Sequence, residues 1–315
     1  MSMFSVVDAA LEASVVGGFS RIGYEVRSRL GDWGTPVDLT GKRILLTGGT
    51  SGIGLAAARM AAAAGARVAI TGRDAGRLQQ AAVQIASQGH APVTVQADKA
   101  DLDQVDAMFD RAVDALGGLD VLVNNAGALD HHFIRSPQGF EQTYAVHVLA
   151  PFRLTAHALD VIDHRGSVIT VSSGGMYTET LDPERLQMTP QEYDGVTAYA
   201  RAKRAQVALT QAWAQRFPQG PTFAAMHPGW ADTAGVRQSL ATFRRMTRPI
   251  LRTPEQGADT IVWLAGTRVP SGRFWLDRRE RGTVRLPWLD YDDQTVQLTF
   301  ETVARDAGVN DLPAA

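Results

Sequence analysis

Residues 43–54, Arg43-Ile-Leu-Leu-Thr-Gly48-Gly-Thr-Ser-Gly52-Ile-Gly54, carry the strongest structural signal in this chain. Its apolar first part predicts a buried strand, and its glycines predict a tight turn that leads into a helix. Glycines let the backbone approach a pyrophosphate closely, and the free N–H groups at a helix N-terminus attract the charge of the phosphates. A glycine motif alone is weak evidence, but one placed between a strand and a helix predicts dinucleotide binding. The residues expected at the cofactor here are Gly48, Thr50, Ser51, Gly52, Ile53 and Gly54.

Short apolar segments alternate with alanine-rich segments from Gly41 onward, which is typical of a parallel sheet with helices on both faces. The predicted strands are 43–48, 66–71, 92–97, 119–123, 166–172, 222–227 and 272–276. The predicted helices are 52–65, 74–88, 101–116, 139–163, 197–217 and 254–266. No repeat or linker divides this region. We therefore predict an α/β chain with one doubly wound Rossmann domain over residues 41–315, a seven-stranded mainly parallel sheet, and substrate-binding loops at 174–196 and 230–252.

Residues 1–40 form a separate N-terminal helical extension in this interpretation. Apolar residues recur at spacings of three or four, which predicts a helical stripe that Gly17, Gly18 and Gly23 weaken or kink. Three roles are open: packing onto the main domain, a dimer contact or pocket lid, and peripheral association with a membrane surface. The low positive charge of the segment counts against the third role.

Composition and charge exclude several classes of protein. The 315 residues carry a formal net charge of -2 with no basic stripe, which argues against a nucleic-acid partner. There is no cysteine, so disulfides and thiolate nucleophiles are excluded. His131 and His132 lack a third spaced ligand, so no metal site is expected. No segment approaches the roughly 20 apolar residues that cross a bilayer, and we expect a soluble, cytoplasmic protein.

Tyr199 and Lys203 are four residues apart, so a helix would place both side chains on one face. A neighbouring ammonium stabilises the phenolate form of a tyrosine, whose unperturbed pKa is about 10. The pair could therefore act as a general acid/base near neutral pH. The chain contains only three lysines, and no other tyrosine has a lysine at the fourth following position. From this spacing alone, an ordinary pair on a surface helix is the alternative.

Five motifs in this order resemble those of the short-chain dehydrogenases/reductases. They are Thr47-Gly48-x-x-x-Gly52-x-Gly54, Asn124-Asn125-Ala126-Gly127, Ser173, Tyr199-x-x-x-Lys203 and Pro228-Gly229-x-x-x-Thr233. The resemblance covers residues 41–276. It implies an enzyme that interconverts a carbonyl and an alcohol by hydride transfer with a nicotinamide dinucleotide.

The resemblance also implies a role for each matching residue. Tyr199 would exchange a proton with the substrate oxygen, and Lys203 would lower the pKa of Tyr199 and hold the ribose hydroxyls. Ser173 would orient the substrate oxygen, with Ser172 as the alternative. The other residues implied at the cofactor are Asp98, Asn125, Ala126, Gly127, Pro228, Gly229 and Thr233.

His147 departs from the pattern that the family implies. The family usually has an asparagine at this position, which helps a water molecule relay protons to the lysine. Histidine can also donate and accept protons, and it titrates near neutrality, so we expect a relay role for His147. The alternative is a buried histidine with satisfied contacts. On the relay interpretation His147→Asn keeps activity and His147→Leu loses much of the turnover.

Cofactor choice should depend on the end of the second strand, Val68-Ala-Ile-Thr-Gly-Arg73-Asp74. A carboxylate there would bind the ribose 2′-hydroxyl of NAD, whereas a cation would bind the 2′-phosphate of NADP. Gly72 stands where relatives that use NAD usually have aspartate, and Arg73 follows it. This predicts NADP, with NAD as a possible cofactor. In the alternative, Arg73 pairs with Asp74 or solvent and selects nothing.

The sequence thus predicts an NADP-preferring oxidoreductase that acts on a small, largely apolar carbonyl or alcohol. The alternative is a dinucleotide-binding regulatory or scaffold protein without turnover, which has no need to keep Ser173, Tyr199 and Lys203 together. By resemblance, two or four copies would pair through the helices at 139–163 and 197–217.

Overall fold

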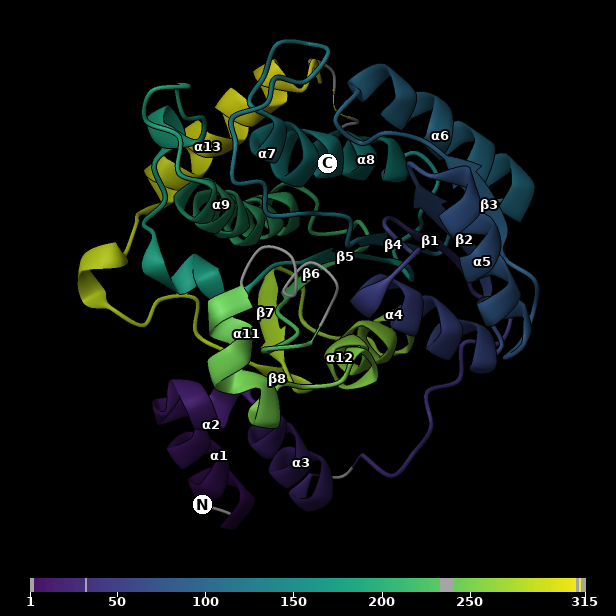
Figure 1. The fold of residues 1–315 in the computed structure, drawn as a ribbon. Coiled ribbons are helices and arrows are strands. Elements are labelled where there is room, and N and C mark those ends of the chain that lie inside the picture. The colour runs from purple at the N-terminus through teal and green to yellow at the C-terminus, as the bar shows by residue number, and fades with distance from the viewer. Residues whose placement is uncertain (1–2, 32, 233–240, 310–311, 313–315) are drawn as a thin grey trace.

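The structure is a computed structural model that describes residues 3–31, 33–232, 241–309 and 312 (Figure 1). One eight-stranded sheet runs through it in the order β3-β2-β1-β4-β5-β6-β7-β8. Strands β1 to β7 are parallel, and only the short β8 is antiparallel to its neighbour. The strands are β1 (Arg43–Leu46), β2 (Arg67–Gly72), β3 (Val93–Gln96), β4 (Val121–Asn124), β5 (Ser167–Val171), β6 (Thr222–Met226), β7 (Arg273–Leu276) and β8 (Arg279–Glu280).

The seven predicted strands are confirmed, and the sheet is the doubly wound α/β type that was expected. After β1 the chain builds β2 and β3 on one side and then returns to build β4 on the other. Ligands of such sheets bind outside the carboxyl ends of the strands, where the order reverses. The glycine turn after β1 lies at this point.

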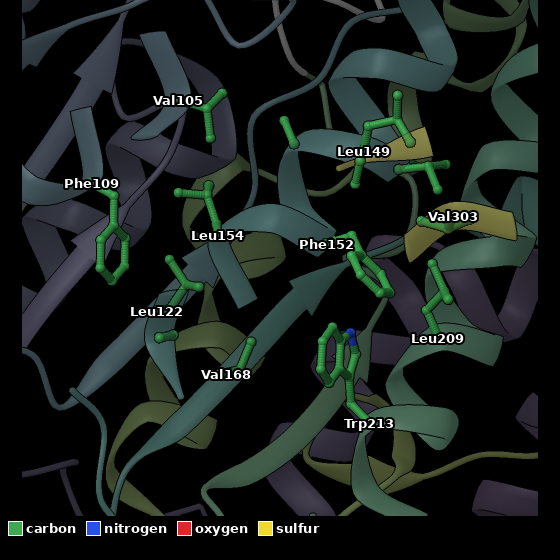
Figure 2. Packing of buried hydrophobic residues seen from close by; sticks show 14 of the residues in the cluster. Val105, Phe109, Leu122, Leu149, Phe152, Leu154, Val168, Leu209, Trp213 and Val303 are labelled. Atoms are coloured by element: carbon green, nitrogen blue, oxygen red, sulfur yellow. The ribbon is translucent and has the colours of Figure 1, made fainter. Parts of the chain in front are cut away.

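Helices cover both faces of the sheet because the strand side chains alternate between two apolar cores. Ile44 and Leu46 point into a core shared with α4, α5 and α12, whereas Leu45 points into a core shared with α6, α8 and α9. The second core also contains Phe152, Leu209 and Trp213 (Figure 2). The helices concerned are α4 (Gly52–Ala63), α5 (Ala75–Ala86), α6 (Leu102–Leu116), α8 (Ala150–Ala158), α9 (Gly195–Arg216) and α12 (Pro254–Gly266).

The helix predicted at 139–163 is shorter and irregular. It begins as α7 (Gln142–Tyr144), passes through a π-helical turn at Ala145–Leu149, and continues as α8. Its predicted first residues instead form a turn, in which Ser136 N–H donates to Phe140 O. A π-helical turn inside a helix often marks a functional position, and His147 lies within this one.

Several elements near the C-terminus were not predicted. They are α11 (Ala241–Thr247), β8 and α13 (Asp293–Asp306). Short 3-10 turns, such as Gly174–Thr178 in the middle of the chain, were not predicted either. Helix α13 lies against α9, and Phe300 on α13 packs on Phe152 and Trp213 (Figure 1). No residue is exposed between Glu141 and Leu159 or between Ala198 and Ala214.

The N-terminal extension is helical as predicted, in three pieces: α1 (Met3–Ala13), α2 (Val15–Phe19) and α3 (Arg21–Leu30). Serines, rather than the glycines, mark the breaks. Ser14 caps α2 by accepting a hydrogen bond from Gly17 N–H at 3.0 Å, and Ser20 separates α2 from α3. The glycines instead let α2 and α3 approach closely, since a Cβ on Gly23 would lie 1.9 Å from Gly17 O.

Within the described ranges, no helix has the length and apolar character needed to cross a membrane.

Candidate active site

The glycine turn after β1 holds two backbone segments too close together for side chains. A Cβ on Gly54 would lie 2.2 Å from Gly48 O, and a Cβ on Gly48 would lie 2.7 Å from Ala126 Cα. Gly48 and Gly52 also have positive φ angles of 71° and 54°. Helix α4 begins at Gly52, so its free N–H groups face the space above the turn. These features fit a pyrophosphate bound at Gly48–Gly54.

The end of β4 braces this turn. Thr47 Oγ1 accepts hydrogen bonds from the N–H groups of Asn125 and Ala126, at 3.0 and 3.1 Å. The side-chain amide of Asn125 donates to Thr47 O at 2.8 Å and to Gly48 O at 3.2 Å. The structure therefore brings Asn125, Ala126 and the glycine turn together, as the sequence motifs predict for a shared cofactor site.

Arg73 lies at the end of β2 and is exposed. Asp74 accepts a hydrogen bond from Arg77 N–H at 2.7 Å and caps α5, so it does not pair with Arg73. In the described part of the chain, no carboxylate forms an ion pair with Arg73. A Cβ on Gly72 would lie 2.6 Å from Thr50 Cγ2, so this position has little room for the side chain of an aspartate.

Asp98 follows β3, at the same edge of the sheet. Its Oδ1 accepts a hydrogen bond from Ala100 N–H at 3.0 Å, and its own N–H donates to Gln104 at 3.0 Å. The side chain thus shapes the turn that leads to α6.

The two serines after β5 have different environments. Ser172 is 2% exposed, and its hydroxyl donates to Lys203 O at 2.8 Å, which ties β5 to α9. Ser173 is partly exposed, caps the following 3-10 turn, and lies close enough to Tyr199 to act on the pKa of its phenol. Of the two hydroxyls, that of Ser173 is therefore the one next to the phenol.

Tyr199 lies one helical turn into α9, whose N-terminus is capped by Asp194. Burial raises the pKa of Tyr199 above its usual value, and the nearby Ser173 hydroxyl opposes this shift. The spacing of Tyr199 and Lys203 predicts a lowered pKa, whereas in the structure the pKa is raised. The reason is that most of Tyr199 is covered, while the ammonium of Lys203 is directed toward Val171 and Gln206.

Lys203 is buried, and its Nζ lies 5.3 Å from the centre of the Tyr199 ring. The Nζ donates to Val171 O at 2.8 Å and to Gln206 Oε1 at 3.1 Å. Burial, together with the nearby Lys99, lowers the pKa of Lys203 to about 7. Near neutral pH this lysine is consequently divided between its charged and neutral forms.

Gln206 belongs to this site, although it was not among the residues predicted from the sequence. Its side chain accepts from Lys203 Nζ and donates to His147 O at 2.7 Å. The amide thus links the lysine to the π-helical turn. Its position three residues after Lys203 on α9 was the available signal, since such residues are neighbours on a helix.

His147 lies beside Tyr199, with ring centres 5.2 Å apart. Its Nε2 is 2.8 Å from Ala128 O. Burial and the nearby Lys203 hold the pKa of His147 well below its usual range, so the ring is neutral at physiological pH. The expectation of titration near neutrality is therefore wrong. The link from His147 to Lys203 runs through its backbone carbonyl and Gln206, and a role for the imidazole remains a prediction.

Pro228 and Gly229 follow β6 and lie near Phe19 and Arg252. Thr233, which the resemblance implies at the cofactor, lies outside the described residues, as does part of the loop expected at 230–252. His227 is buried against the rings of Phe19 and Phe274, which agrees with a packing role.

The profile of the family described as short chain dehydrogenase matches residues 42–242. This segment contains the glycine turn, Ser173, Tyr199 and Lys203. The chain belongs to the short chain dehydrogenase family.

Two known relatives of this short chain dehydrogenase are similar to it over most of its length. Human dehydrogenase/reductase SDR family member 12 is 38% identical over 255 residues, which cover 78% of this chain and 80% of the relative. A short chain dehydrogenase from Burkholderia cenocepacia J2315, solved in complex with NADP, is 31% identical with a TM-score of 0.63. That match covers 75% of this chain and 96% of the other.

A third relative is the angucycline C-6 ketoreductase LanV, solved with bound NADP. It is 27% identical with a TM-score of 0.63, over 76% of this chain and 94% of that one. The chain is therefore an oxidoreductase of the short chain dehydrogenase family by sequence and by fold.

Lys99 is a second buried lysine near Lys203 and His147. It follows Asp98 and is 5% exposed. Its Nζ makes no hydrogen bond with any residue that the structure describes. Burial lowers the pKa of Lys99 to about 7. Lys99 also lies close enough to lower the pKa of Lys203 and that of His147.

We expect Lys99→Met to weaken the dependence of stability on pH. The pKa of Lys99 is about 7 in the folded chain, against about 10.4 in an unfolded one. The unfolded chain therefore binds more protons between these values, and the free energy of unfolding rises with pH in this window. Removing Lys99 should reduce that slope by about 1 kcal/mol per pH unit. Urea unfolding at several pH values between 7 and 10 measures it.

The matched control is Lys42→Met, at a partly exposed lysine that follows the turn before β1. The free energy of unfolding of this variant should rise with pH as steeply as that of the wild type. Equal slopes for Lys99→Met and the wild type would show that Lys99 does not carry the expected cost of burial.

Proposed function

We propose that this short chain dehydrogenase is an NADP-preferring carbonyl reductase, or the corresponding alcohol dehydrogenase, with Tyr199 as its general acid/base. The observation that supports the proposal most is the meeting of Ser173 from the end of β5 with Tyr199 and Lys203 from α9. These residues lie at the carboxyl edge of the sheet, beside a glycine turn suited to a pyrophosphate. Two solved relatives with bound NADP support the choice of cofactor.

NADPH would supply the hydride when bound. The chain's own residues then have separate tasks. Ser173 donates a hydrogen bond to the carbonyl oxygen, and Tyr199 donates its phenolic proton to the same oxygen. A raised pKa suits Tyr199 for this direction of the reaction, because the phenol stays protonated at neutral pH. Lys203 holds the ribose hydroxyls, and its contacts with Val171 and Gln206 orient it.

Binding of the cofactor is assigned to a second set of residues. The turn Gly48–Gly54 receives the pyrophosphate, with Thr50, Ser51 and Ile53 along it. Asp98 and the segment Asn125–Gly127 line the adenosine side. Tyr199, Lys203, Pro228, Gly229 and Thr233 surround the nicotinamide side. Arg73 binds the 2′-phosphate, since it is exposed at the end of β2 and Asp74 is engaged as a helix cap.

We expect Arg73→Ala to weaken NADPH binding and to leave NADH binding almost unchanged. Loss of a hydrogen bond between charged groups costs about 1.5–3 kcal/mol, which predicts a rise of about 10- to 100-fold in the dissociation constant of NADPH. Titration of both cofactors by fluorescence measures the effect. Arg77→Ala is the control, because Arg77 is also exposed and lies four residues after Arg73, in the first turn of α5. Tighter binding of NADH than of NADPH to the wild type would contradict the assignment.

The reaction itself is tested with retinoid, steroid, aliphatic and quinone carbonyls, followed by NADPH absorbance. Oxidation of NADPH with at least one class supports the proposal. Tight cofactor binding without oxidation by any class would favour the regulatory or scaffold protein instead.

A further inference from the structure

The N-terminal extension is held against the rest of the chain by a buried cluster of charges. Arg27 on α3 is 0% exposed and donates to Asp8 at 2.7 Å and to Asp277 at 2.8 Å. Asp277 lies in the turn between β7 and β8, and it also accepts two hydrogen bonds from Arg252, at 2.6 and 2.9 Å. Arg281, which follows β8, donates to both carboxylate oxygens of Asp8. Residues far apart in sequence are thereby joined into one unit.

This cluster places Phe19, the last residue of α2, at the candidate active site. The ring of Phe19 meets Gly174, the residue after Ser173, so closely that a Cβ there would lie 2.7 Å from Phe19 Cε2. The carbonyl of Phe19 accepts hydrogen bonds from Trp230 N–H at 2.8 Å and from Arg252 Nε at 3.0 Å. A Cβ on Gly229 would lie 2.6 Å from the same carbonyl.

Phe19 therefore touches two segments that end at the proposed reaction centre. One follows Ser173 and the other follows Pro228. Each has a glycine at the point of contact: Gly174 meets the Phe19 ring, and Gly229 meets the backbone carbonyl of Phe19. The fixed ion cluster prevents the extension from moving away without breaking buried charge pairs.

The surroundings of Phe19 are aromatic. Its ring centre lies 6.0 Å from that of Trp230 and 6.1 Å from that of Tyr177. The guanidinium of Arg285 lies 4.7 Å from the ring centres of Phe19 and Tyr177 and is held by Glu12 on α1. Phe19 and Tyr177 are buried in one apolar cluster that directly adjoins the segments after Ser173 and Pro228. Apolar, aromatic surroundings at the reaction centre favour an apolar, ring-bearing carbonyl compound over a small charged one.

Resting on the function proposed above, we propose that the N-terminal extension completes the substrate pocket. Phe19 spaces the segment after Ser173 from Pro228–Trp230, and so sets the size of the ring-bearing carbonyl compound that reaches Tyr199. It is a specificity-determining residue contributed by a part of the chain that precedes the matched family region.

The test compares acetophenone with the bulkier benzophenone as substrates of NADPH-dependent reduction. Phe19→Ala should raise the ratio of kcat/KM for benzophenone to that for acetophenone by about tenfold or more, since pocket contacts of one or a few carbon groups discriminate by about 10- to 200-fold. Phe19→Leu should give a smaller rise in the same direction. The dissociation constant of NADPH, measured in parallel, should stay within about twofold of the wild type, because the contact with Gly229 is made by the backbone carbonyl of residue 19, which both variants keep.

Val15→Ala is the matched control, because Val15 lies on the same helix and is 49% exposed. The ratio of its kcat/KM values for the two ketones should equal that of the wild type. Phe19→Leu keeps an apolar side chain at position 19. Its ketone ratio tests the proposal if Phe19→Ala does not fold.

Gly174→Ala supplies a second measurement of the contact. In the wild-type background the new methyl group meets the Phe19 ring, so kcat/KM should fall for both ketones. In the Phe19→Ala background the same substitution should cost less. Equal losses in the two backgrounds would contradict the contact between residues 19 and 174.

The outcomes separate this inference from the proposed function. An active wild type whose ketone ratio is unchanged in Phe19→Ala and Phe19→Leu overturns the inference alone. A wild type that binds NADPH but reduces neither these ketones nor any other carbonyl tested overturns the proposed function, and the inference falls with it.

Discussion

Tyr199→Phe is expected to lower kcat for carbonyl reduction by about 10²- to 10⁴-fold, the usual range for loss of a positioned general acid. The phenylalanine ring keeps the packing against His147, and the substitution removes only the hydroxyl near Ser173. The dissociation constant of NADPH should change little. Steady-state kinetics with a carbonyl from the panel, together with cofactor titration, measures both quantities.

Tyr193→Phe is a suitable control because it removes another phenol near the start of α9. The Tyr193 hydroxyl lies 3.0 Å from Thr143 Oγ1 and donates to Asp130 O. Its loss should leave kcat within about threefold of the wild type, as expected for a residue away from the reacting atoms. Retention of wild-type turnover by Tyr199→Phe would remove Tyr199 from the mechanism.

The pH profile of the wild type adds a distinct readout for Tyr199. Burial raises the pKa of this phenol, so the acid form persists as the pH rises from 7 to about 9. The rate of reduction should therefore not decline over that interval through deprotonation of Tyr199. A decline that begins near pH 7 and disappears in Tyr199→Phe would instead show the lowered pKa that the sequence suggests.

Asp277→Asn is expected to destabilise the folded chain by about 3–5 kcal/mol, because it leaves two buried guanidinium groups without their shared carboxylate. Asp277 and Arg252 are each 1% exposed, and Arg27 is fully buried. Asparagine has nearly the same shape and tolerates the positive φ of 53° found at this position. The substitution thus tests charge rather than backbone conformation. Urea unfolding followed by tryptophan fluorescence measures the change.

Asp163→Asn provides the comparison for an exposed ion pair. Asp163 pairs with Arg165 at 3.3 Å, and both side chains are largely exposed. Such pairs contribute about 0–1 kcal/mol, so this variant should unfold close to the wild type. If Asp277→Asn and Asp163→Asn unfold at the same urea concentration, the buried cluster does not hold the extension in place.

Local patterns were sufficient to predict the sheet and the order of its helices. Ile44, Leu45 and Leu46 form a continuous apolar run because both faces of a parallel strand are buried, and the glycines after them determine where the strand ends. The same local signals predicted α4 and α12. They could not predict β8, which has two residues and depends on β7 for its hydrogen bonds.

The contacts between residues far apart in the chain could not be predicted from the sequence. Arg27 and Asp277 are 250 positions apart, and no periodicity in the sequence indicates that they are in contact. The predicted direction of the pKa shift of Tyr199 was also wrong for this reason. Spacing places Lys203 near the phenol, but only the fold shows that Val171 and Gln206 bind the ammonium and that burial raises the pKa of Tyr199.

The packing of α13 on α9 limits how two copies of this chain could associate. Between Glu141 and Leu159, and between Ala198 and Ala214, every residue is at least partly covered within a single chain. Part of that cover on α8 and α9 comes from Phe300 and Val303 of α13. A second copy that approached this face would meet α13 first. Subunits paired directly through α8 and α9 would need α13 to swing away, which would expose Phe152 and Trp213 until the new interface had closed over them.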